Sequence, residues 1–417
     1  MRFYIDPGTG SMLFTILIGV LGAAFYAFRG LWVKIRFLLS GGKAEKMTDR
    51  IPIVLFTDSK RYWNLFGPIC DELERRRMDA VYMTASADDP ALSQQYQHVR
   101  CRFIGEGNQA FTRMNLLAAD IVLTSTPGLD VYQWKRSRDV RWYVHVPHMV
   151  NDITTYRMFG TDFFDALLLS GQVQADQIRA LEKKRNLPAK ELELAGMPYL
   201  DAMRERLMNA PALPDHPTTV LLAPSWGESA ILKRFGGEIL DSLLETGYHV
   251  IVRPHPQSFS SEKEMLEDLM SRYPDSEQLE WNRDNDNFEV LRRSDILISD
   301  FSGVIFDFAL VFDKPVICAD TSFDKAPYDA CWLDEEMWTF RVLPEIGQQL
   351  SRESFPHLRE MIDECLKDER YASGRERARA EAWANIGCSA SRIADYLEEK
   401  LRALADEKKD NSSGVKK

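Results

Sequence analysis

The feature that most constrains the fold of this chain is a repeated alternation between short apolar runs and longer segments with helical spacing. The run "IPIVLFTDS" at 51–59 is followed by the helix-like segment "YWNLFGPICDELERRRM", and further apolar runs include "DAVYMTA", "ADIVLTSTP" and "FDALLLSG". Continuous apolar strands that alternate with helices are typical of a parallel sheet with helices on both faces. The pattern therefore predicts an α/β protein of the doubly wound type.

The alternation is interrupted once and then begins again. The stretch "NAPALPDHP" at 209–217 is rich in proline and has no strand-like run, whereas "TTVLLAPS" at 218–225 starts a second series. A chain of 417 residues, 45% of them hydrophobic, is long enough for two cores. We predict two Rossmann-like domains that face each other across a cleft, at 49–208 and 215–395, and a helical or disordered tail at 396–417.

The N-terminal part of the chain has the composition of a membrane segment. The run "MLFTILIGVLGAAFYAF", from Met12 to Phe28, contains no charged residue, and basic residues follow it from Arg29 onward. A helix needs roughly 17–25 apolar residues to cross a bilayer, and a signal peptide would carry its positive charges before the run. We therefore predict a transmembrane helix within an anchor and linker at 1–48, in a single-pass protein of the inner (cytoplasmic) membrane whose remaining chain is cytoplasmic.

Charge and cysteine content argue against two classes of function. A net charge of −11 and a pI near 5.3 disfavour non-specific binding to nucleic acid. The six cysteines are scattered, without a CxxC pair or a cluster of histidine and cysteine, which argues against a zinc site and for reduced thiols. We predict no nucleic-acid partner, no metal and no cofactor.

Polar residues gather where the predicted strands end, at the edge of an open α/β sheet where ligands bind. In the second domain, prolines on both sides of His255 present its imidazole beside Arg253, and Ser225 follows another strand in "APSWG". In the first domain, "HVPH" places His145 and His148 three residues apart, and either could act as a base. The alternative for all three histidines is a structural role, in which each one satisfies nearby backbone groups.

The stretch "SDFSGVIFDFAL" predicts a phosphate-binding site at the start of a helix. The first N–H groups of a helix lack intrahelical acceptors and lie at the positive end of the dipole, so Ser302 and Gly303 suit an anion. Asp300 fits better as a cap acceptor or as a partner for a hydroxyl group. Asp307, isolated among apolar residues, is expected to be a structural buried acid that needs a partner.

Four stretches, in order along the chain, resemble blocks of the CDP-glycerol glycerophosphotransferases, enzymes that prime and polymerise glycerol-phosphate or ribitol-phosphate teichoic acids. They are "FDALLLSGQVQADQIRALEKKRNLPAKELELAGMPYLDAM", "TVLLAPSWGES", "HVIVRPHPQ" and "SDILISDFSGVIFDFALVFDKPVICAD", and the likeness covers roughly 140–395. The resemblance implies a GT-B fold of two Rossmann-like domains, which agrees with the pattern of strands and helices.

The resemblance also implies roles for individual residues. His255 matches the histidine of the family's His-Pro block, which is implicated in catalysis or in binding the donor pyrophosphate. Asp300, Ser302 and Gly303 match the donor-phosphate block, with Gly303 where the family usually has a second serine. In the family's His-Gly-Thr-Pro block the histidine is a proposed base; this chain reads "VHVPHMVND" there, with His148 as the best match and His145 as the alternative.

These correspondences imply a divergent transferase of the family. The expected reaction moves a polyol-phosphate unit from a CDP-linked donor to a lipid-linked or polymeric acceptor at the membrane and releases CMP. Two other classes stay open: a GT-B glycosyltransferase or epimerase that uses a nucleotide sugar, and a non-catalytic, membrane-anchored nucleotide-binding protein. The altered first histidine motif favours the last class, whereas retention of His255, Asp300 and Ser302 opposes it.

Overall fold

The computed structural model describes residues 50–284, 286–320 and 323–414, with side chains through residue 407. The predicted transmembrane helix and linker lie outside these residues. Within the described part of the chain, no helix is both long and apolar enough to cross a bilayer. Residues 51–417 form one compact unit, so the boundaries predicted at 208, 215 and 395 stay a prediction.

The first sheet confirms the parallel α/β pattern. Within the described residues it has seven strands in the order β3-β2-β1-β4-β5-β6-β7, and every neighbouring pair is parallel. The central strand β1 is buried along almost its whole length because both faces of the sheet are covered. The strands are β1 (Ile51–Thr57), β2 (Ala80–Thr84), β3 (Val99–Phe103), β4 (Ala119–Thr124), β5 (Val140–His145), β6 (Ala166–Leu169) and β7 (Glu191–Leu194).

The second sheet repeats the arrangement with shorter strands. Six parallel strands of the described chain run in the order β10-β9-β8-β11-β12-β13. They are β8 (Thr219–Leu222), β9 (His249–Val252), β10 (Leu279–Trp281), β11 (Ile296–Ser299), β12 (Val316–Ala319) and β13 (Gly347–Leu350).

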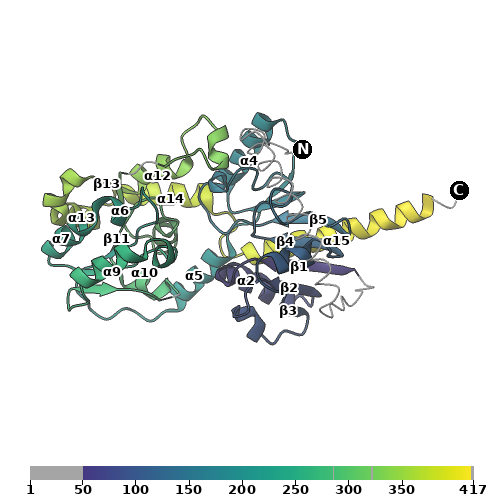
Figure 1. Cartoon of the computed structure of the whole chain (residues 1–417), viewed down its shortest axis with the longest axis horizontal. Coiled ribbons are helices and arrows are strands. Elements are labelled where there is room, and N and C mark those ends of the chain that lie inside the picture. The colour runs from purple at the N-terminus through teal and green to yellow at the C-terminus, as the bar shows by residue number, and fades with distance from the viewer. Residues whose placement is uncertain (1–49, 285, 321–322, 415–417) are drawn as a thin grey trace, which may run out of the picture. The chain divides into compact units, whose positions relative to one another are not determined.

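Helices connect the strands and cover the sheets (Figure 1). The α-helices are α2 (Trp63–Arg75), α3 (Asn108–Met114), α4 (Gln172–Arg185), α5 (Pro198–Asn209), α6 (Ile231–Phe235), α7 (Gly237–Glu245), α8 (Ser258–Ser261), α9 (Lys263–Arg272), α10 (Phe288–Arg293), α11 (Val304–Phe306), α12 (Trp338–Ile346), α13 (Leu358–Lys367), α14 (Arg370–Ala382) and α15 (Ser389–Gly414). Short 3-10 helices are η1 (Lys60–Tyr62), η2 (Pro90–Ser93), η3 (Ile153–Thr155), η5 (Asp329–Trp332) and η6 (Arg352–His357), and η4 (Asp307–Val311) is a π-helix.

Three strands were not predicted from the sequence pattern, and all three lie at sheet edges. β7 reads "ELEL", β10 "LEW" and β13 "GQQL", and they stand at the ends of their sheets. An edge strand is often short and partly exposed, so it lacks the continuous apolar run that identifies a central strand.

Two helical segments are not regular. The segment 231–245 is divided into α6 and α7 at Gly236, whose φ of 54° lies in the left-handed region that glycine favours. The segment after β11 begins as the short helix α11 and continues as the π-helix η4 from Asp307. π-Helical turns are often found at functional sites, although the turn by itself identifies none.

The C-terminal helix α15 returns to the first sheet. Figure 1 shows α15, in yellow, beside β4 and extending beyond the sheet. Arg76, directly after α2, donates to Asp395 and Ser391 of α15, and Trp142 of β5 donates to the Tyr396 hydroxyl. The end of the chain therefore covers the sheet formed by its beginning.

Candidate functional site

The carboxyl ends of the strands collect the predicted polar groups, as the topology requires. In the first sheet Thr57 is paired in register with Thr84, and Thr124 with His145. In the second sheet the same edge carries the loops that follow β8, β9 and β11, which hold Ser225, the His255 segment and Asp300.

His145 ends β5 and is fully buried. Its Nε2 lies 3.1 Å from the Tyr156 hydroxyl, and its ring contacts Tyr156 and Phe164. Burial lowers the pKa of His145 to about 3, with a smaller contribution from His148, so the ring is neutral at pH 7. Among the described residues, its Nδ1 has no hydrogen-bond partner. A buried neutral histidine beside a tyrosine cannot reach a substrate directly.

His148 lies three residues further along, in the loop after β5, and is partly exposed. Its Nδ1 is 3.4 Å from the same Tyr156 hydroxyl, and its ring packs on Tyr62 with centroids 4.7 Å apart. Loss of solvent and, to a lesser extent, the positive charge of Arg61 lower the pKa of His148 to about 4. His148, Tyr62 and Tyr156 line a pocket of about 370 Å³. Of the two first-domain histidines, His148 is therefore the one that faces a space for a ligand.

Three of these neighbours were not predicted as site residues. Tyr156, at the end of η3, joins His145 and His148 through one hydroxyl, while Arg61 and Tyr62 follow β1 in η1. The rule that ligand groups gather at the carboxyl ends of strands could have identified Arg61 and Tyr62. Tyr156 has no such signal, because the fold of the loop alone brings it beside the histidines.

His255 is held by its own loop. It follows β9, and its Nδ1 accepts the backbone N–H of Gln257 at 3.1 Å, which leaves the proton of the neutral ring on Nε2. The ring is partly exposed and lies near Trp226, with ring centroids 6.5 Å apart. Partial burial and the charge of Arg61 lower the pKa of His255, and Glu262 opposes this effect. His255 is thus arranged as an N–H donor from Nε2.

Arg253, two residues before His255, is turned toward its own sheet. Its guanidinium donates to the Asn282 side chain, and its backbone N–H donates to Leu222. Burial lowers the pKa of Arg253, while Asp284 and Asp286 raise it. Arg253 therefore contributes positive charge near the carboxyl edge of the second sheet, with part of its guanidinium already engaged.

Asp300 is a buried acceptor that organises the loop after β8. Its carboxylate accepts the N–H groups of Ser225, at 3.0 and 3.1 Å, of Ile231 at 3.1 Å and of Phe301 at 2.7 Å. Burial raises the pKa of Asp300, and these hydrogen bonds oppose the rise. Since Ile231 is the first residue of α6, Asp300 caps that helix rather than the one that follows β11. Ser225, buried, is positioned by this contact.

Ser302 and Gly303 lie in the loop after β11, where Ser302 is partly exposed and Gly303 is exposed. Gly303 is exposed and precedes α11, and a Cβ built on it would meet no atom within 4 Å. The space over this helix start is open, as a phosphate-binding site requires. The helix α11 itself is short.

Asp307, at the start of η4, has the side-chain partner that the sequence required. The Asn287 amide donates to its Oδ2 at 3.2 Å, and burial raises the pKa of Asp307 to about 8. A carboxyl group in this environment is partly protonated at neutral pH, which agrees with the expected structural acid.

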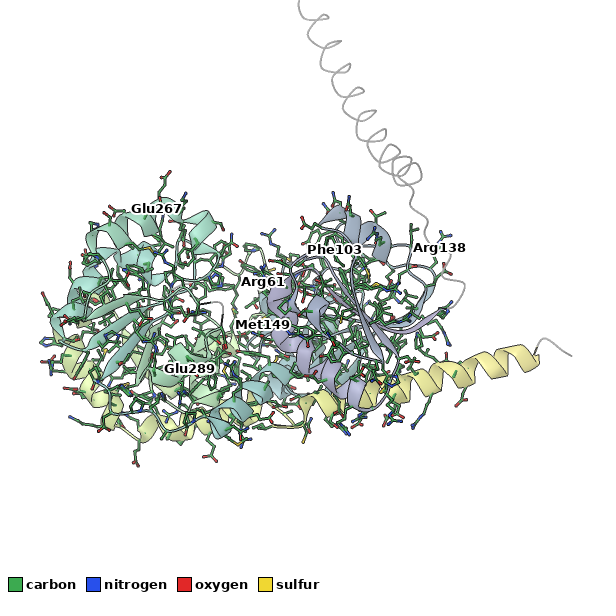
Figure 2. The ribbon with its side chains drawn as sticks, turned by 90° about the horizontal axis from the view of Figure 1, so that it is seen from below. Arg61, Phe103, Arg138, Met149, Glu267 and Glu289 are labelled. Atoms are coloured by element: carbon green, nitrogen blue, oxygen red, sulfur yellow. The ribbon has the colours of Figure 1, made fainter. Side chains whose placement is uncertain are left out.

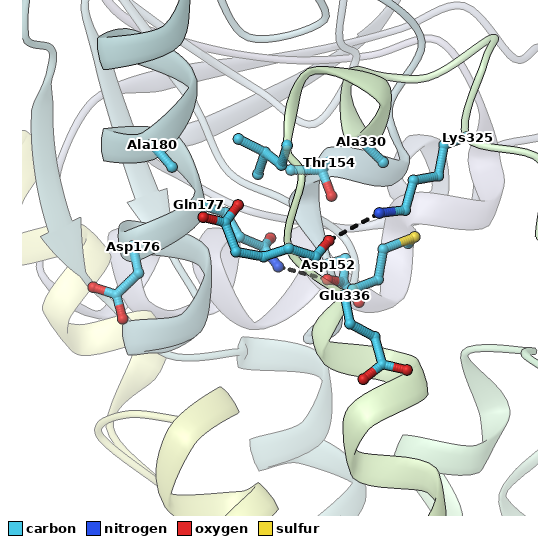
Figure 3. Close-up of a pocket in the computed structure, with 11 residues that line it drawn as sticks. Asp152, Thr154, Asp176, Gln177, Ala180, Lys325, Ala330 and Glu336 are labelled. Atoms are coloured by element: carbon cyan, nitrogen blue, oxygen red, sulfur yellow. Dashed lines mark hydrogen bonds between the residues drawn. The ribbon is translucent and has the colours of Figure 1, made fainter.

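A second pocket, of about 210 Å³, is lined by other residues, which Figure 3 draws. Asp152 lines it, yet its carboxylate already accepts from Gln177, from the backbone N–H groups of Trp338 and Thr339, and from the Thr339 hydroxyl. Asp152 therefore joins the loop after β5 to the start of α12. No group of three or more metal-ligating side chains is found among the described residues.

Comparison with solved structures defines the class of fold. The wall teichoic acid polymerase TagF, soaked with CDPG, aligns with 85% of this chain and 89% of its own at a TM-score of 0.52 and 14% identity. UDP-GlcNAc 2-epimerases from Neisseria meningitidis and Methanocaldococcus jannaschii align with 84% of this chain and 100% of theirs, at TM-scores of 0.55 and 0.54 and 14% identity. The protein shares with them an α/β fold with parallel sheets.

The family is shown by the sequence itself. The model of the CDP-glycerol:poly(glycerophosphate) glycerophosphotransferase family matches residues 161–397, more than half of the chain. The chain belongs to this family, which confirms the resemblance and makes it a transferase of the nucleotide-linked phosphotransferase type. A search of curated proteins found no match. His255, Asp300, Ser302 and Gly303 lie inside the matched region, whereas His145 and His148 precede it.

Proposed function

We propose that the protein transfers a glycerol-phosphate or related polyol-phosphate unit from a CDP-linked donor to a membrane-associated acceptor, with release of CMP. The observation that carries the proposal is the family match, because it includes the second-domain residues suited to donor phosphates. The catalytic part would then work at the inner face of the cytoplasmic membrane, held there by the predicted anchor.

In this proposal the second domain holds the donor. The pyrophosphate lies over the open helix start at Ser302 and Gly303, where backbone N–H groups favour an anion. His255 donates from Nε2 to the phosphate that leaves with the nucleotide, a role that its hydrogen bond from Gln257 prepares. Arg253 adds positive charge.

His148 is the proposed base. An acceptor oxygen attacks the distal phosphorus of the donor, the bond from that phosphorus to the CMP oxygen breaks, and the acceptor proton passes to His148. For Nε2 to accept this proton, the resting proton of the ring must be on Nδ1, where the Tyr156 oxygen lies 3.4 Å away. Tyr156 can then donate its own proton to His145 Nε2. A positioned general base typically contributes about 10²–10⁴-fold.

A panel of donors tests the proposal. The full-length protein is incubated with membranes and with CDP-glycerol, CDP-ribitol or UDP-N-acetylglucosamine, and the released nucleotide is identified by chromatography. Release of CMP that depends on the membrane acceptor supports the proposed transfer. Turnover of no CDP-linked donor would refute it.

The same panel addresses a second candidate, an enzyme that acts on a nucleotide sugar. The TM-scores to the two UDP-GlcNAc 2-epimerases are as high as that to TagF, so the fold alone does not separate the reactions. Release of UDP, or epimerisation of UDP-N-acetylglucosamine, would favour this candidate, and tight binding of a donor without turnover would favour a non-catalytic nucleotide-binding protein.

A further inference from the structure

Arg61 is a cation at the carboxyl end of the first sheet that forms no ion pair with the described residues. It is exposed, and its Nε donates to the Ser59 hydroxyl at 3.1 Å. Among the described residues, neither Nη1 nor Nη2 of Arg61 has a hydrogen-bond partner, and the side chain forms no ion pair. Arg185 differs, since it is buried and binds the carboxylates of Asp162 and Asp329.

The ring of Tyr62 contacts Arg61 without using the two terminal nitrogens of its guanidinium. The guanidinium carbon lies 5.6 Å from the ring centroid of Tyr62, within the range of a cation–π contact. The Tyr62 ring in turn packs on the imidazole of His148. Arg61, Tyr62 and His148 therefore form a connected set in which the two terminal nitrogens of the exposed arginine have no hydrogen-bond partner among the described residues.

Arg61 also acts on the second domain. Its positive charge lowers the pKa of His255 as well as that of His148, and such an effect requires that it lie near both rings. Figure 2 shows Arg61 in the region between the two sheets. One unpaired cation thus stands near a histidine from each half of the molecule.

Among the described residues, no carboxylate forms an ion pair with Arg61. Asp58, the first residue after β1, is exposed and forms no ion pair with Arg61 in the described chain; loss of solvent raises its pKa, and the hydrogen bond with Thr126 and the charge of Arg61 oppose the rise. Glu262, near His255, accepts the N–H of Gly227. A guanidinium with two free nitrogens beside two neutral imidazoles suits a phosphate group, whose oxygens accept two parallel N–H bonds.

We propose that Arg61 binds the phosphoryl group that is transferred and holds it between His148 and His255. The assignment rests on the proposed function. During transfer, the bond from the acceptor oxygen to phosphorus forms, the bond to CMP breaks and the acceptor proton moves to His148. Arg61 keeps its protons throughout and neutralises the charge that develops on the phosphoryl oxygens.

Histidine NMR tests the position of Arg61 without any activity. In the full-length protein, the Cε1–H signals of His148 and His255 are titrated in wild type, in Arg61→Gln and in Lys60→Gln. Lys60 is the matched control, because it precedes Arg61 and is paired with Asp88. Arg61→Gln is expected to raise the pKa of both histidines, and Lys60→Gln neither. If Arg61→Gln leaves both values unchanged, Arg61 does not lie between them.

Binding of three probes locates the phosphate that Arg61 contacts. Calorimetry compares CDP-glycerol, CMP and inorganic phosphate with wild type and Arg61→Gln. Because CMP lacks the transferred phosphate, Arg61→Gln is expected to weaken CDP-glycerol binding at least about tenfold and to leave CMP binding unchanged. An equal loss for CMP would place Arg61 on the nucleotide phosphate and overturn the assignment, as would unchanged binding of CDP-glycerol.

Kinetics then separate a catalytic from a merely structural role. Arg61→Gln is expected to lower kcat for CMP release by about 10²–10³-fold, the range for removal of one charge-stabilising donor. Arg61→Lys restores only part of the rate, since an ammonium cannot form two parallel bonds to one phosphate. Lys60→Gln stays within about twofold of wild type. A full rate in Arg61→Gln overturns the assignment.

The two proposals fail in different ways. If no donor releases CMP while Arg61→Gln still shifts both histidines and weakens CDP-glycerol binding, the proposed transfer is wrong and the phosphate site stands. If CMP release depends on His148 and His255 but not on Arg61, the transfer stands and the role of Arg61 is wrong.

Discussion

The two histidine sites differ in what holds the imidazole. His148 belongs to a chain of side chains, in which Tyr156 connects it to the buried His145 and Tyr62 packs on its ring. His255 is fixed by a backbone N–H two residues away and keeps a partly exposed ring. The first site therefore depends on packing between distant segments, whereas the second is built by its own loop. A substitution near the first site should alter protonation more readily than one near the second.

The largest effect is expected from removal of either imidazole. His148→Ala and His255→Ala should each lower kcat for CMP release by about 10²–10⁴-fold, because one loses the base and the other a donor to the leaving phosphate. Thermal melting should change little, since both rings are partly exposed. His216→Ala, in the exposed segment after α5, is the control and should keep the wild-type rate. If both site variants turn over CDP-glycerol normally, the mechanism is wrong; if only His255→Ala is impaired, the first site is not catalytic.

The next largest effect concerns stability, which should depend on pH in opposite ways through His145 and through Asp307. The pKa of His145 is about 3 in the folded protein, below its ordinary value of 6.5, so the unfolded chain binds the extra proton first. Its contribution to stability is present above pH 6.5 and is lost as the pH falls toward 3. Asp307 has a folded pKa of about 8 against an ordinary 3.8, so its contribution is present below pH 3.8 and is lost as the pH rises through 8.

Melting curves from pH 4 to 9 of two variants check these signs. His145→Gln should lose less stability than wild type on acidification, and Asp307→Asn less on going from pH 4 to 8. For each variant, the change in the free energy of unfolding across this pH range should differ from that of wild type by on the order of 1 kcal/mol. Neighbouring groups and water reduce the full effect of a shifted pKa. Parallel curves for a variant and wild type would show that the residue is not the titrating group.

A smaller effect is expected when the connection within the first site is cut. Tyr156→Phe keeps the ring but removes the hydroxyl that His148 Nδ1 faces, and so it no longer favours the form of His148 with a bare Nε2. We expect kcat to fall about tenfold and KM for the donor to stay constant. Nitrogen NMR of His148 should show a larger population protonated at Nε2 than in wild type. An unchanged tautomer would mean that Tyr156 acts only by packing.

The smallest effect is expected from substitutions at Gly303 and Ser302, where the donor phosphate is proposed to bind. Gly303 has a φ of −57° and open space above it, so Gly303→Ser can adopt the same backbone without a clash. The serine hydroxyl would add a donor where the family usually has one, and donor KM should fall about twofold to fivefold, the value of a modest hydrogen bond. Ser302→Ala is the matched removal and should raise the donor KM. A rise of KM in Gly303→Ser would show that the donor needs the exposed backbone rather than a hydroxyl.

The same contrast between local and distant interactions explains what could be predicted from the sequence. The central strands of both sheets were predicted because their apolar runs are long and buried on both faces, while the edge strands β7, β10 and β13 were missed because they are short or polar. The partner of Asp307 was expected from its isolation among apolar residues, but its identity as Asn287 depends on the fold of the preceding loop.

The sequence by itself determined the α/β class, the family and the position of His255, since apolar runs, motif order and flanking prolines are properties of neighbouring residues. Only the tertiary structure decided which of His145 and His148 faces a pocket, that Asp300 caps α6, and that the charge of Arg61 acts on both His148 and His255. The physical reason is distance along the chain. Burial, shared hydrogen bonds and charge act between atoms that are close in space, and the packing of the sheets brings those atoms together.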